Sequence, residues 1–190
     1  MFVVHAGNRL DLPGRGNSRF AASAVQRVTG QVETLLAALK PQRLVSAPAA
    51  GADLIVLGVA QRLGIPVHIV LGLPIADFVA QSVADHQPVW MDRFERVIQR
   101  AADSHIDVVE SLDFGHLEQW WFATNSYLIR RVGELAAEFG DPTIVALTIR
   151  SLQLEVPPSA TDDLALKASA AGWPVITVDP GPPAHAASKE

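Results

Sequence analysis

Short, unbroken apolar runs alternate with longer segments of helical periodicity along this chain. Segments such as 19–39, 51–64 and 116–140 carry apolar residues at helical spacing. Strands without polar alternation are typical of a parallel sheet covered by helices on both faces. The sequence therefore predicts an α/β protein with a three-layer, Rossmann-like fold and a mostly parallel sheet of about six strands. The expected strands are residues 2–7, 43–48, 66–73, 106–111, 143–149 and 174–180.

Two regions complete this pattern. Residues 74–83 and 88–104 predict one broken helix or two successive helices, because Pro88 interrupts the periodicity. Residues 161–172 predict a last helix with acidic residues in its first turn. We expect a single domain over residues 1–180 and a disordered tail over residues 181–190.

Composition excludes several kinds of site. The 190 residues include no cysteine, which rules out disulfides, thiolate zinc sites and cysteine nucleophiles. The six histidines show no ligand spacing, so no metal site is expected, and no cofactor either. A net charge of -5 argues against nucleic acid as a partner, because non-specific binding needs a basic surface.

The apolar runs are too short for a membrane. None reaches the roughly 18 residues that a spanning helix needs, and the N-terminus lacks the basic region of a signal peptide. We therefore expect a soluble, cytoplasmic protein without a membrane partner.

The loop after the first strand is the first candidate site. In open parallel sheets, ligands bind beyond the carboxyl ends of the strands. Residues 5–20, "HAGNRLDLPGRGNSRF", begin at that edge and contain several glycines together with Arg9 and Arg15. The two arginines suit a phosphate or a carboxylate, although solvated arginines on a surface loop explain the same pattern.

The loop "APAAGAD" at residues 47–53 is the second candidate. Its small residues Ala50 and Gly51 allow a ligand to approach the backbone, and the following helix start offers free N–H groups to an anion. Asp53 suits the hydroxyls of a ribose. A single glycine and a first-turn aspartate are also common in a tight strand-to-helix connection, and this structural role is favoured when the loop is read alone.

The third candidate is "EVPPSATDDL", residues 155–164. Ser159 or Thr161 suits a helix cap, and Asp162 and Asp163 suit a sugar, although capping alone explains these residues. Glu118 is the acid best placed to reach the site from the helix at 116–140. The nearby cluster "WWF" (120–122) predicts core packing, with one tryptophan as an alternative rim of a pocket.

Taken in order, these loops resemble the SLOG superfamily, the Rossmann-like group that includes the Smf and LOG proteins. "AGNR" (6–9) stands where that family has a T-G-H-R-like motif, with Asn8 in place of histidine, and "APAAGAD" lacks the first glycine of G-x-A-x-G-A-D. "SATDD" (159–163) replaces a late G-G-T-A-D motif. The runs at 63–83 and 90–98 are similar to the family's G-x-P-V-H-x-V-L-P-F and W-x-x-R-F segments, so the resemblance spans about residues 2–180.

The resemblance implies a site for a nucleotide or a nucleotide derivative. Phosphate would lie near the helix start after Gly51, and ribose or base toward the late loop. LOG-type members hydrolyse nucleoside monophosphates with a P-G-G-x-G-T-x-x-E signature. Here Pro157 and Pro158 stand in the region of its glycines and Leu164 stands at its glutamate. Proline lacks the N–H that holds phosphate, so this departure favours binding over catalysis.

Three functions follow from these observations. The first is a sensor-like module of bacterial signalling or stress response that binds a nucleotide-like small molecule. The second is an enzyme that cleaves an N-glycosidic bond of a nucleotide, with Glu118, Asp53 and Asp163 as candidate acids. The third is a degenerate interaction module. The resemblance further implies a homo-oligomer and a separate effector protein. The expected ligand-binding residues are Gly7, Asn8, Arg9, Ala50, Gly51, Asp53, Ser159, Thr161 and Asp163.

Overall fold

The six expected strands form one sheet in which every neighbouring pair is parallel. The computed structural model describes residues 1–14, 18–152 and 159–181. The strand order is β4-β3-β2-β1-β5-β6. The sheet confirms the α/β, Rossmann-like prediction. The strands are β1 (Phe2–Gly7), β2 (Arg43–Ser46), β3 (Val67–Leu71), β4 (Val108–Ser111), β5 (Ile144–Ile149) and β6 (Val175–Val178).

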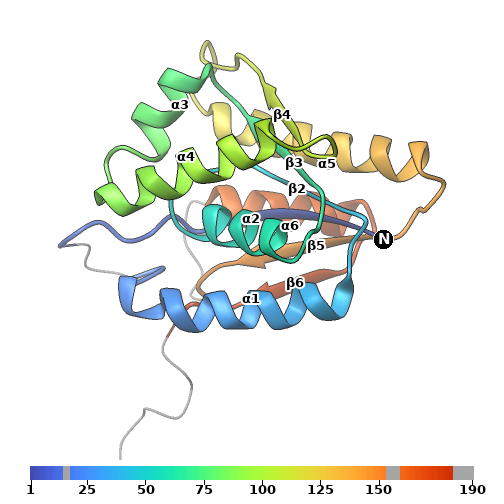
Figure 1. Cartoon of the computed structure of the whole chain (residues 1–190), viewed down its shortest axis with the longest axis horizontal. Coiled ribbons are helices and arrows are strands. Elements are labelled where there is room, and N and C mark those ends of the chain that lie inside the picture. The colour runs from blue at the N-terminus through green and yellow to red at the C-terminus, as the bar shows by residue number, and fades with distance from the viewer. Residues whose placement is uncertain (15–17, 153–158, 182–190) are drawn as a thin grey trace, which may run out of the picture.

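Helices cover both faces of this sheet (Figure 1). Helices α1, α2 and α4 pack on one face, and α5 and α6 pack on the other, which gives the expected three layers. The helical elements are η1 (Ala22–Ala24), α1 (Val25–Leu39), α2 (Ala52–Arg62), α3 (Ile75–Ser82), α4 (Pro88–Ala102), α5 (Trp120–Glu138) and α6 (Ala160–Ala170).

Successive residues of each strand supply alternate faces of the core. Val3 and Leu44 pack with the helices of the first face, whereas Phe2, Val4 and Val45 pack with α5 and α6. All five are fully buried. A strand buried on both faces is mostly apolar, which explains the runs in the sequence, although His5, Ser46, His68 and Thr148 are buried polar residues of these strands.

Helix α4 begins where the sequence predicts, whereas α5 begins later than predicted. The segment 74–104 forms two helices rather than one, and Pro88 is the first residue of α4, where its missing N–H costs nothing. Helix α5 begins at Trp120 rather than at 116. The preceding chain follows the end of β3, with Leu112 N donating to Leu71 O at 2.8 Å and Phe114 N to Gly72 O at 2.9 Å.

Candidate functional site

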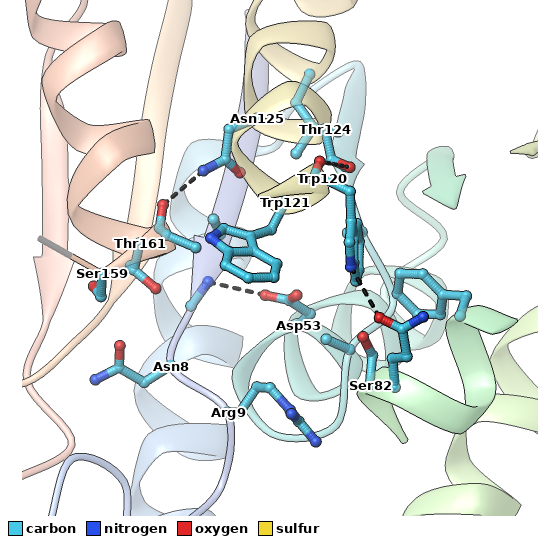
Figure 2. A pocket seen from close by; sticks show the side chains of 18 of the residues that line it. Asn8, Arg9, Asp53, Ser82, Trp120, Trp121, Thr124, Asn125, Ser159 and Thr161 are labelled. Atoms are coloured by element: carbon cyan, nitrogen blue, oxygen red, sulfur yellow. Dashed lines mark hydrogen bonds between the residues drawn. The ribbon is translucent and has the colours of Figure 1, made fainter. Parts of the chain in front are cut away.

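A cavity of about 410 Å³ lies at the carboxyl ends of the central strands, where the strand order reverses. The chain passes from β1 to β2 on one side, and β5 pairs with β1 on the other. Parallel sheets of this kind hold ligands at this switch point. The lining residues come from five parts of the chain (Figure 2): Ala6, Gly7, Asn8, Arg9, Arg19, Ala47, Ala49, Asp53, Phe78, Gln81, Ser82, Trp120, Trp121, Thr124, Asn125, Leu128, Ser159, Ala160 and Thr161.

The cavity brings together most of the residues that the sequence singled out. Gly7, Asn8, Arg9, Asp53, Ser159 and Thr161 all line it, whereas Ala50, Gly51, Asp163 and Glu118 do not. The loops after β1 and β2 and the start of α6 therefore share one volume. Arg15, Pro157 and Pro158 lie outside the residues that the structure describes.

Ala50 and Gly51 join the loop after β1 to the start of α2. Gly51 forms an isolated antiparallel bridge with Arg9, and Leu10 N donates to Ala50 O at 3.4 Å. Ala52 N donates to Asn8 O at 3.2 Å, so one N–H at the start of α2 is already bonded to protein. The small residues of this loop bring the two segments into close contact.

Asp53 is the acidic side chain of the cavity, and it is 6 % exposed. Its Oδ1 accepts a hydrogen bond from Gly7 N at 2.9 Å and lies 3.2 Å from Nε2 of His5, without well-aligned hydrogen-bond geometry. The other ring nitrogen of His5, Nδ1, lies 2.9 Å from Leu147 O. A carbonyl only accepts, so Nδ1 carries a proton. Burial raises the pKa of Asp53 above its ordinary value.

Arg9 reaches the rim of the cavity, but its guanidinium is already paired. Nη2 of Arg9 forms an ion pair with Asp85 and lies 3.1 Å from Nδ1 of His86. Nε2 of His86 lies 3.0 Å from Leu10 O. Burial acts to raise the pKa of Asp85, but the hydrogen bonds and charges of Arg9 and His86 together hold that pKa below its ordinary value. An anion at Arg9 must therefore compete with Asp85.

The start of α5 supplies an aromatic wall. Trp120 donates from Nε1 to Gln81 Oε1 at 3.0 Å and packs edge-on against Phe78 at 5.8 Å between ring centroids. Trp121 is 39 % exposed, and Figure 2 shows its indole between Thr161 and Asp53. Trp121 therefore offers a ring surface to the cavity while Trp120 anchors the helix.

Asn125 joins this wall to the start of α6. Its Nδ2 donates to Ala160 O at 2.6 Å and to Asp163 Oδ2 at 3.0 Å, and Asp163 also pairs with Lys167. Asp163 therefore orients the Asn125 side chain, although Asp163 does not itself line the cavity. Ser159 caps α6 through a capping box with Asp162, so it serves as a helix cap and a cavity wall at once.

Sequence reasoning did not single out Arg19 or the contributions of α3. Phe78, Gln81 and Ser82 reach the cavity from that helix, which follows β3. The only available signal was their place after a strand, at the sheet edge where ligands bind. Among the residues that the structure describes, no His, Cys, Asp and Glu side chains gather as a metal-binding group.

Comparison with solved structures finds proteins of similar fold, one of which is described below. No protein-family model matches the chain, and no curated protein matches it either. The fold is similar to the X-ray structure of DNA processing protein A (DprA) from Streptococcus pneumoniae, with a TM-score of 0.42 and 17% sequence identity. The alignment covers 92% of this chain and 57% of the DprA chain, so this chain spans less than two thirds of DprA.

One expectation from the sequence is corrected here. Net charge predicted no nucleic-acid partner, whereas the protein of similar fold is, by its name, a DNA-processing protein. Net charge does not support the exclusion, because it is an average over the chain and a local basic surface is compatible with an acidic total. In the part of the chain that the structure describes, no helix is both long and apolar enough to cross a membrane.

Proposed function

We propose that the cavity at the switch point binds a nucleotide or a nucleotide-derived small molecule, and that the chain is a sensor-like module of the SLOG type. The observation that carries this proposal is the convergence of three separate loops and an exposed indole on one volume. At about 410 Å³, that volume lies within the usual range for small-molecule sites.

The lining suits the parts of a nucleotide. Trp121 presents a ring face on which a base can stack, a contact worth about 1–3 kcal/mol per base. Asn8, Ser159 and Thr161 supply amide and hydroxyl groups for a sugar or a base edge. Arg9 supplies a guanidinium for phosphate once it exchanges Asp85 for the ligand.

Calorimetric titration with nucleoside monophosphates, NAD and cyclic dinucleotides tests the proposal. We expect one of these classes to bind and to raise the unfolding temperature. Trp121→Ala should weaken that binding by about tenfold or more through loss of stacking. Leu166→Ala is the matched control, because Leu166 is 63% exposed and does not line the cavity. Absence of binding by every class, or equal binding by both variants, contradicts the proposal.

A second candidate function is cleavage of an N-glycosidic bond, and the environment of Asp53 favours it. Of the three candidate acids, Asp53 lines the cavity, whereas Glu118 and Asp163 do not. A carboxyl whose pKa is raised by burial suits a general acid. Incubation with nucleoside monophosphates and NAD should release free base from the wild-type chain and none from Asp53→Asn. Release that survives this substitution excludes Asp53 from the reaction.

A further inference from the structure

A second, smaller cavity lies between α2 and α4, away from the switch point. Its volume is about 230 Å³, and four of its lining residues are arginines. Helices α2 and α4 are neighbours on one face of the sheet (Figure 1). The arginines are Arg62 from α2 and Arg93, Arg96 and Arg100 from α4.

Helix periodicity explains why these side chains converge. Arg93, Arg96 and Arg100 are spaced i, i+3 and i+7, which places them on one stripe of α4 over about 10 Å of its length. Arg62 follows Gly58 by four residues, so both face α4 from α2. A Cβ at Gly58 would meet no atom within 4 Å beyond its own helix backbone, so Gly58 leaves space beside the cavity.

The positive charge of this cavity is only weakly offset, by a long ion pair of Arg62 with Glu33 and by a hydrogen bond from Arg62 Nη1 to Gly58 O at 3.4 Å. Glu33 lies 3.9 Å from Nη2 of Arg62, too far for a hydrogen bond. Within the described ranges, Arg93, Arg96 and Arg100 form no ion pair. Arg93 instead lies over the Trp90 ring at 4.7 Å. Burial lowers the pKa of Arg93, and the charges of Arg96 and Arg62 lower it further, which is the mark of mutual repulsion.

We propose that this arginine cavity binds a compact oligophosphate anion of two or three linked phosphoryl groups. Guanidinium groups bind phosphate oxygens in bidentate fashion, and an anion with several charges relieves the repulsion among four of them. The concave shape and the short stripe of α4 suit a compact anion better than an extended strand. Free oligophosphate and the phosphate tail of a nucleotide share this chemistry.

Calorimetric titration of the full chain with inorganic tripolyphosphate in low-salt buffer tests the proposal. Arg96→Gln combined with Arg100→Gln should weaken binding by about tenfold or more, because each guanidinium provides charge-assisted hydrogen bonds. Arg93→Gln is measured separately, because Arg93 also packs on Trp90, and circular dichroism checks its fold. Arg130→Gln is the matched control, since Arg130 is an exposed arginine of α5 that pairs with Glu134.

Further ligands separate the sources of phosphate. Adenosine triphosphate that binds as tightly as tripolyphosphate indicates recognition of phosphate alone, and tighter binding indicates a nucleotide tail; either result supports the site. The proposal is overturned by no binding, by an equal response to sulfate, or by unchanged binding in the double variant. Tighter binding of a single-stranded oligonucleotide through the same arginines also overturns it, in favour of a nucleic-acid surface. Arg9→Gln should leave tripolyphosphate binding unchanged, because Arg9 is the phosphate-binding candidate of the larger cavity and does not line the arginine cavity.

Discussion

Replacement of Gly51 with alanine should be strongly destabilising, because two independent costs combine at this position. Gly51 has φ of +113°, a conformation that L-residues adopt only with strain of about 1–3 kcal/mol. A Cβ added there would lie 2.6 Å from Leu10 N and 2.9 Å from Asn8 O. Both neighbours are backbone atoms, so they cannot rotate away, and the overpacking adds about 1–3 kcal/mol. We expect a total loss of about 4 kcal/mol in unfolding free energy.

Urea denaturation of the variant measures this loss, with Gly140→Ala as the matched control. Gly140 also has a positive φ, of +65°, but nothing lies within 4 Å of its Cβ position. Gly140→Ala should therefore cost only the backbone strain, about 1–2 kcal/mol. For a chain of this size, the Gly51→Ala variant should also have an unfolding temperature about 8–16 °C lower than the wild type.

The difference in unfolding free energy between the two variants is the decisive measurement. If Gly51→Ala costs no more than Gly140→Ala, then the loop after β1 does not contact the start of α2 as closely as described. An equal cost would also remove the reason for assigning Gly51 to the contact between these segments. A ligand that contacts Asn8 and Arg9 should bind more weakly to Gly51→Ala than to Gly140→Ala. Only Gly51→Ala displaces the loop that carries these two residues.

Three further substitutions test the surroundings of the cavity and the edge of the sheet. Asp53→Asn should flatten the pH dependence of the unfolding free energy. In the wild-type chain the pKa of Asp53 is higher in the folded state than the ordinary 3.8, so the unfolding free energy falls as pH rises from the ordinary to the folded pKa. Urea titrations at several pH values measure this difference. Tyr127→Phe should cost about 1 kcal/mol at neutral pH, because Tyr127 donates to Glu110. Burial acts to raise the pKa of Glu110, but hydrogen bonds from Tyr127 and His68 hold it below 4.5. The cost of Tyr127→Phe should therefore vanish as the pH falls through this lowered pKa, where Glu110 becomes protonated. Ser159→Ala should cost about 1 kcal/mol in urea through loss of the α6 cap, and no loss would show that the capping box is dispensable.

The sequence could predict the architecture because burial leaves a direct trace in residue type. The central strands are buried by helices on two faces, so they read as apolar runs, as in "TIVALTI" around β5. The site was predictable as far as it follows from chain order. Asp53 and Thr161 lie in the first turns of the helices that follow β2 and β5, and a parallel sheet brings the carboxyl ends of those strands to one edge.

Features that depend on contacts between residues far apart in the chain could not be predicted from the sequence. Ser82 reaches the cavity only because α3 folds over the end of β3, and its type carries no sign of this position. The four arginines between α2 and α4 are separated by up to 38 positions, from Arg62 to Arg100, so net charge does not report their convergence. A sum over the chain removes the spatial information that an electrostatic argument needs.

The glycines around the switch point change how a ligand there is recognised. A Cβ at Gly7 would lie 2.2 Å from Ala52 Cβ, and a Cβ at Gly72 would lie 2.0 Å from Thr124 Oγ1. At these two positions and at Gly51, the absence of a side chain lets strand ends and loops pack directly against neighbouring helices. The space that each glycine leaves is therefore filled by protein atoms. A ligand in the cavity would therefore meet mainly side chains such as those of Asp53 and Trp121, besides Gly7, which also lines it. Substitution of Trp121 should alter binding with little effect on the fold, whereas substitution of the glycines should alter both.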